Sequence, residues 1–158
     1  MEMGKSSAWL TDHEQRAWRT YREVGTLLLY QLGRDLEPFH LTINDYEILV
    51  NLSESPGHRM RMSDLARATL QSKGRLSHQI SRMESAELVR REDCESDRRG
   101  LYAVLTEEGW ETMRRVAPHH VAAVREHFID LLPTEDQAAL RKALAPVAEH
   151  LRARRDTP

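Results

Sequence analysis

The sequence contains very little cysteine and no long apolar segment. Cys94 is the only cysteine among 158 residues, which excludes a disulfide within the chain and fits a reducing compartment. No apolar run approaches the roughly 20 residues that cross a bilayer, and the first residues lack the apolar core of a secretory signal. We therefore expect a cytoplasmic protein with no membrane partner.

The chain also lacks the patterns that mark enzymes and metal sites. It has no glycine-rich phosphate loop, and Cys94 has no identifiable base and lies among acids that oppose a reactive thiolate. His119, His120 and His127 contain no pair at the i, i+4 spacing of a helical metal site. We predict no catalytic residue, no metal and no cofactor, and surface or interface roles for these histidines.

What the chain does contain is a locally basic middle. The formal net charge is −2, yet residues 59–82 hold six Lys or Arg and a single acid, Asp64. A basic stripe on a slightly acidic protein is typical of a polyanion site. A solvated, arginine-rich face would give the same count, so charge alone leaves both interpretations open.

Helix signals precede this basic region. Thr11 and Glu14 form a capping box before an apolar pattern at helical spacing, which ends ahead of Pro38. Thr42 begins a second helix, which the breaker "SESPG" ends. The sequence thus predicts one long helix and one shorter helix before residue 59.

Two further helices follow the basic region. Thr106 is the expected cap of a third long helix, which Pro118 should kink or restart. Thr134 and Gln137 have the spacing of a capping box for the last helix. The long helices carry more apolar surface than a small central lobe can cover, which predicts that they pack on a second copy of the chain.

The centre has the pattern of a winged helix-turn-helix. "RMRM" at 59–62 alternates like a short strand, Ser63 is the expected cap of a short helix, and Ser72 is the expected cap of the next. "LVRRED" and "GLYAVLT" read as two strands of a hairpin. The predicted fold class is therefore mainly α with a small β-hairpin wing, flanked by long N- and C-terminal dimerisation helices.

The helix after Ser72 separates an apolar stripe from a polar arc. At about 100° per residue, Leu76, Ile80 and Met83 share one side, and Arg75, His78 and Arg82 share an arc opposite them. Such a helix fits the major groove of DNA, where arginine bonds guanine, and its N-terminus can hold a phosphate. The candidate DNA contacts here are Ser72, Lys73, Arg75, Ser77, His78, Gln79 and Arg82.

The hairpin adds a second basic element. Its expected tip, "DRRG", places Arg98 and Arg99 beside a glycine. An arginine-tipped wing can lie along the minor groove, whose negative potential favours arginine. Asp97, Arg98 and Arg99 therefore join the candidate DNA contacts.

Three segments together resemble the MarR family of bacterial transcription regulators: "MSDLARAT", "SKGRLSHQISRMESAELVRRE" and "DRRGLYAVLTEEG". The resemblance is strongest in the wing pattern of Asp97 and Arg99 followed by Leu105 and Thr106. It implies that Arg99 enters the minor groove and that Asp97 helps to hold it. It also implies a homodimer joined through the first and last helices, and release from DNA by a small aromatic or anionic effector. Glu87 stands where many members have glycine.

These observations predict a sequence-specific, DNA-binding transcription regulator that acts as a ligand-responsive repressor on a near-palindromic operator. The alternative is a winged-helix module that binds another protein. We expect one winged-helix domain over residues 1–158, with dimerisation helices at about 11–36 and 107–155 and a DNA-binding lobe at about 42–105. Trp18 and Tyr21 are candidates for an effector pocket, although aromatics at this spacing are usually core or dimer contacts.

Overall fold

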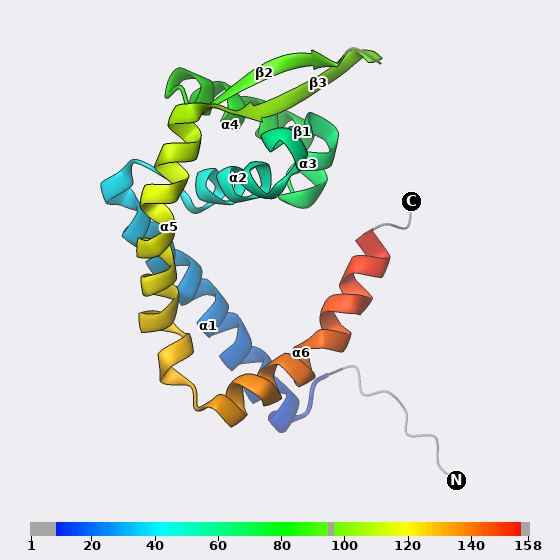
Figure 1. Cartoon of the computed structure of the whole chain (residues 1–158). Coiled ribbons are helices and arrows are strands. Elements are labelled where there is room, and N and C mark those ends of the chain that lie inside the picture. Colours follow the sequence, from blue (N-terminus) through cyan, green and yellow to red (C-terminus); the bar gives the residue numbers. More distant parts are fainter. Residues whose placement is uncertain (1–8, 95–96, 156–158) are drawn as a thin grey trace. The chain divides into compact units, whose positions relative to one another are not determined.

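The computed structural model describes residues 9–94 and 97–155, and the side chains of 97–99 lie outside that description. The order of its elements confirms the order predicted from the sequence (Figure 1). The elements are α1 (Asp12–Leu36), η1 (Glu37–Phe39), α2 (Ile43–Glu54), η2 (Pro56–His58), β1 (Arg59–Arg61), α3 (Met62–Ala68), α4 (Lys73–Ser85), β2 (Val89–Cys94), β3 (Asp97–Leu105), α5 (Glu107–His127), η3 (Ile129–Leu131) and α6 (Thr134–Arg155).

The chain divides into two compact units, Met1–His120 and Val121–Pro158. The first unit contains a three-stranded antiparallel sheet in the order β1-β3-β2. Figure 1 shows β2 and β3 as a hairpin that extends past α4. In the part of the chain that the structure describes, no helix has the length and apolarity to cross a membrane.

The core of the first unit joins the helix-turn-helix to the sheet and to α5. Its side chains are aliphatic and almost completely buried, so the hydrophobic effect fixes α4 against its neighbours. The largest fully buried residues are Leu36, Ile48, Leu49, Leu52, Leu65, Leu76, Ile80, Met83, Val89 and Val116.

Four of the predicted helix caps are confirmed. Thr11 closes a capping box with Glu14, and Thr42 closes one with Asp45. The Ser72 hydroxyl oxygen accepts the Arg75 N–H at 3.3 Å, and that of Thr106 accepts the Gly109 N–H at 2.9 Å. These bonds satisfy N–H groups that the first turn of a helix leaves open.

Two predicted caps are wrong. β1 runs directly into α3, which begins at Met62, so Arg61 and not Ser63 occupies the cap position. α6 begins at Thr134 itself, so Thr134 cannot be its cap. The Gln137 side chain instead donates to the carbonyl oxygens of Ile129 and Leu132, at 3.2 and 2.9 Å.

Two prolines lie inside helices, and the helix that was expected to kink or restart at Pro118 does not restart there. Pro118 lies inside a continuous α5, and Pro146 lies inside a continuous α6. Proline removes only one backbone donor, which a helix of 21 residues can lose without ending.

The wing hairpin is longer than predicted. β3 already begins at Asp97, whose backbone pairs with Cys94, so Arg98 and Arg99 belong to a strand and not to an open tip. Strand pairing continues this far because β2 also extends to Cys94. The side chains of Asp97, Arg98 and Arg99 lie outside the described residues, so their predicted roles remain predictions.

The two aromatic residues singled out on α1 do not belong to the core of a single chain. Trp18 is 52% exposed and Tyr21 is 58% exposed. Their rings stack on each other with centroids 6.1 Å apart. The interpretation that these two rings are buried in the core of one chain is therefore wrong, and the interpretation that they contact a partner chain remains.

Candidate nucleic-acid interface

The apolar stripe of α4 is buried as the helical wheel predicts. Leu76 and Ile80 are completely buried, and Met83 is 2% exposed. The stripe fixes which side of α4 faces outward. The outward side begins at Ser72, whose hydroxyl is already engaged in capping the helix.

Three exposed polar side chains of α4 have no bonding partner among the described residues. Lys73, Arg75 and His78 are exposed. Within the described residues, their side chains make no hydrogen bond or ion pair. Arg75 and His78 lie on the side of α4 that faces the groove toward α2, and Lys73 lies on the wing side, so each can meet a ligand without first breaking a contact inside the protein.

A second side of α4 is bound to α2. Gln79 is 8% exposed, and its amide donates to Asp45 Oδ1 at 2.9 Å. Arg82 Nη2 donates to the same oxygen at 2.5 Å. The structure therefore does not present Gln79 as a free base reader, and it places Arg82 in an internal ion pair.

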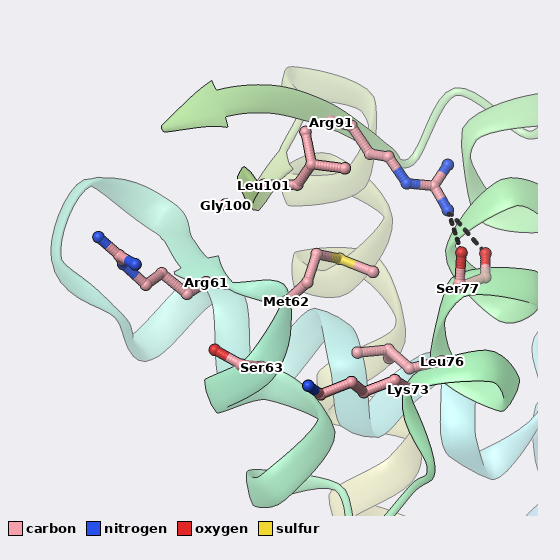
Figure 2. A pocket seen from close by; sticks show the side chains of 9 residues that line it. All are labelled: Arg61, Met62, Ser63, Lys73, Leu76, Ser77, Arg91, Gly100 and Leu101. Carbon is pink, nitrogen blue, oxygen red and sulfur yellow. Dashed lines mark hydrogen bonds between the residues drawn. The ribbon is translucent and has the colours of Figure 1, made fainter. Parts of the chain in front are cut away.

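A third side of α4 is bound to the wing. Arg91, on β2, forms a salt bridge with Glu84, and its backbone N–H donates to Glu84 Oε1 at 2.9 Å. The Arg91 guanidinium also donates to the Ser77 carbonyl at 2.7 Å and to the Ser77 hydroxyl at 3.2 Å (Figure 2). It donates to the Ser81 hydroxyl at 3.2 Å as well. Ser77, predicted to flank the readout arc, therefore contacts the wing.

Two grooves follow α4 on its two flanks. The groove on the wing side has a volume of about 380 Å³, and Figure 2 shows side chains from β1, α3, α4 and both wing strands around it. The groove on the α2 side has a volume of about 510 Å³. Its lining residues are Thr42, Asn44, Gln71, Gly74, Arg75, His78, Gln79 and Arg82.

Part of the basic stripe is neutralised within the protein. Arg59 lies 3.8 Å from Glu92 and 4.9 Å from the centre of the Tyr102 ring. Arg67 pairs with Asp64 at 3.4 Å. Among the Lys and Arg of residues 59–82, those without a partner in the described residues are Lys73 and Arg75, both on α4.

Cys94 is buried, 4% exposed, and lies 3.2 Å from Arg61 Nη2. The described residues contain no group of three or more metal-ligating side chains that could hold a metal ion. His120 packs on the Tyr46 ring at 4.4 Å, and burial lowers the pKa of its imidazole, with a smaller opposing effect from Asp35. This environment favours a neutral ring.

The sequence prediction missed three residues that shape this surface: Asp45, Glu84 and Arg91. Asp45 carries a local signal, because it is the third residue after the Thr42 cap. Its bonds to Gln79 and Arg82 span 34 and 37 residues, and no sequence spacing indicates them. Gln79 carries a weaker signal, since on the helical wheel it falls beside Met83 at the border of the buried stripe.

Comparison with known proteins identifies a matching family and similar solved structures. A model described as "MarR family" matches residues 40–100. The chain is similar to AbsC, a MarR family transcriptional regulator from Streptomyces coelicolor, with 73% identity, a TM-score of 0.88, and coverage of 93% of this chain and 99% of that one.

Two other proteins are also similar. Sco3205 from Streptomyces coelicolor, a MarR family transcriptional regulator solved in complex with DNA, is 45% identical, with a TM-score of 0.88 and coverage of 94% of this chain and 93% of that one. The transcriptional regulator PecS of Dickeya dadantii is 27% identical over 84% of this chain and 80% of its own length.

Proposed function

The chain belongs to the MarR family of DNA-binding transcription regulators, and on that premise we propose that the outward side of α4 reads the major groove of an operator. Proteins of this family regulate transcription and are not enzymes. The observation that carries the proposal is that Arg75 and His78 are exposed along one groove beside α4 and, like Lys73 on the wing side of the helix, have no partner among the described residues.

Each of the three side chains has a role that its chemistry supports. Arg75 can donate two parallel hydrogen bonds to guanine O6 and N7, and His78 can bond a neighbouring base edge. Lys73, in the first turn of α4, is placed for a backbone phosphate, together with N–H groups at the helix start. Arg98 and Arg99 complete the proposal as wing contacts to the minor groove, with Asp97 holding Arg99.

Operator binding by purified variants tests this assignment. The operator is first selected from genomic fragments with the wild-type protein. Arg75→Ala should then lose about 1–3 kcal/mol of operator binding, roughly 5- to 150-fold in Kd, and should relax preference at one base position. Arg114→Ala is the matched control, because it removes an exposed arginine from α5 that pairs only with Glu111 in its own helix. If the two variants bind alike, the proposal is wrong.

We also propose that the regulator is a homodimer. Large apolar side chains are exposed along α1 and, in the second unit, along α6, and such surface is costly to leave in water. They include Trp18, Tyr21, Leu29, Tyr30, Leu144, Val147 and Leu151. Two copies would place their α4 helices about one DNA turn apart, so the half-sites should lie roughly 10 base pairs apart. A mass of 18.3 kDa at micromolar concentration, with DNA binding intact, would contradict this.

The proposed regulation is release from DNA by a small aromatic or anionic effector, which makes the protein a repressor. The exposed, stacked rings of Trp18 and Tyr21 support an aromatic ligand. Aromatic carboxylates should weaken operator binding by the wild-type protein and should have less effect on Trp18→Ala. An equal response in both proteins would show that Trp18 is not part of the effector pocket.

The protein-interaction alternative makes a different prediction about salt. Operator binding that depends on phosphate contacts weakens steeply as the salt concentration rises, because condensed counterions are released. Binding that is flat in salt and independent of DNA sequence would favour the alternative.

A further inference from the structure

Asp45 is a buried carboxylate that belongs to the N-terminus of α2. It is 4% exposed. Its Oδ2 accepts the Thr42 N–H at 2.9 Å and the Thr42 hydroxyl at 2.7 Å, which closes the capping box. Asp45 Oδ2 therefore acts at the start of α2, where it accepts a hydrogen bond from a backbone N–H that would otherwise be unpaired.

The other oxygen of Asp45 belongs to a contact with α4. Asp45 Oδ1 accepts from Gln79 Nε2 at 2.9 Å and from Arg82 Nη2 at 2.5 Å. Gln79 and Arg82 are three residues apart and so lie on one side of the helix. One oxygen atom on α2 thus holds two side chains of α4, and the charge-assisted bond to Arg82 is the stronger kind.

We propose that Asp45 is a positioning residue for DNA recognition, which fixes the rotation of α4 about its axis and the direction of the Arg82 guanidinium. This inference rests on the proposed function. An α-helix with its side chains is about 10–12 Å wide, so a rotation of only 10° displaces the tip of an outward side chain by about 1 Å. Base readout requires placement to about 0.5 Å, so a loose helix would still bind phosphate but discriminate poorly between sequences.

The Arg82 side chain is 55% exposed even though it is paired with Asp45. A guanidinium carries five N–H donors, and the bond to Asp45 occupies one side of it. Arg82 also lines the groove on the α2 side of α4, together with Arg75 and His78. Asp45 therefore holds Arg82 in one orientation, while more than half of the Arg82 side chain stays exposed beside the groove at which we place the DNA.

The test compares specificity, which a purely structural role would not change. Dissociation constants are measured for the operator and for an unrelated duplex of equal length, at one salt concentration. Asp45→Ala should lower the ratio of specific to non-specific affinity at least tenfold. Thr42→Ala is the matched control: it disturbs the same capping box and should lower Tm, yet it leaves the bonds to α4 intact and should keep the ratio within twofold of wild type.

Combined variants then ask whether Asp45 acts through Gln79 and Arg82, the two side chains that it holds. If it does, adding Asp45→Ala to the double variant of Gln79→Met and Arg82→Ala should change the Kd for the operator by no more than about twofold. A larger further loss, or an unchanged specificity ratio in Asp45→Ala, would overturn the proposal. Should Asp45→Ala fail to fold, Gln79→Met replaces it, because it removes one donor to the same oxygen and keeps an unbranched buried chain; an unchanged ratio would overturn the proposal equally.

A measurement without DNA separates this proposal from the proposed function. Amide hydrogen exchange in the free protein should accelerate within α4 in Asp45→Ala, whereas in Thr42→Ala it should accelerate at the start of α2 only. Equal protection of α4 in the two variants would refute the positioning role. Failure of the wild-type protein to bind any duplex would refute the proposed function instead.

Discussion

Replacing Glu87 by glycine should stabilise the protein. Glu87 has a φ of 60°, in the left-handed region, and it follows Ala86 at the end of α4. Its N–H donates to the Glu84 carbonyl at 2.9 Å, and the Leu88 N–H donates to the Met83 carbonyl at 3.0 Å. This pair of bonds is a Schellman motif, whose left-handed position usually holds glycine because glycine has no Cβ to clash with the backbone.

The size of the effect follows from two opposing contributions. A left-handed conformation costs an L-residue about 1–2 kcal/mol, and Glu87→Gly removes that cost. Glycine loses more backbone freedom on folding, which costs about 0.5–1 kcal/mol. The net gain is therefore about 0.5–1 kcal/mol, which corresponds to a rise in Tm of about 1–4 °C for a chain of this length.

Calorimetry on Glu87→Gly and Glu87→Ala tests this reasoning. Both variants remove the exposed Glu87 side chain and its negative charge, but only glycine relieves the strained backbone. Glu87→Ala should therefore stay within about 0.5 kcal/mol of wild type. If the two variants melt at the same temperature, the left-handed strain is absent and the argument fails.

Three further predictions concern packing, protonation and the wing. A Cβ on Gly109 would lie 2.0 Å from the Leu88 carbonyl oxygen, so Gly109→Ala should cost about 1–3 kcal/mol by thermal unfolding; an unchanged Tm would contradict this. Burial lowers the pKa of His120 from the value of 6.5 that it has when unfolded, so the unfolded chain binds more protons and stability falls as pH drops below 6.5. His120→Gln should flatten that fall in Tm between pH 7 and 5, and an identical profile would exclude His120. Arg99→Ala and Asp97→Ala should both weaken operator binding at several salt concentrations; tighter binding by Asp97→Ala would show that Asp97 does not hold Arg99.

The features that the sequence predicted correctly depend on residues close together in the chain. The capping box at Thr11 uses residues three apart, the cap at Thr42 stands directly before its helix, and the stripe of α4 follows the helical repeat. The misplaced cap at Ser63 has a tertiary cause: pairing of β1 with β3 holds the chain extended to Arg61, and α3 then begins at once. Propensity alone does not include that pairing.

The candidate site was predictable in outline and not in detail. Leu76, Ile80 and Met83 were enough to indicate which side of α4 faces outward, and Arg75 and His78 are exposed there. Which outward residues are already engaged depends on partners far away in the sequence. Arg91 reaches Ser77 across 14 residues, and Asp45 reaches Gln79 across 34, so a helical wheel cannot distinguish these side chains from unpartnered ones.

Because two sides of α4 are bonded to α2 and to the wing, only some of its residues can change when a regulator with this architecture evolves to bind a new operator sequence. Substitutions at Gln79 or Arg82 would release Asp45, and substitutions on the wing side would release Arg91. Descendants of this protein that change their target sequence should therefore vary first at Lys73, Arg75 and His78, while positions bonded to α2 and to the wing vary only in concert with their partners. To redirect this regulator to another operator, protein engineers should therefore randomise Lys73, Arg75 and His78.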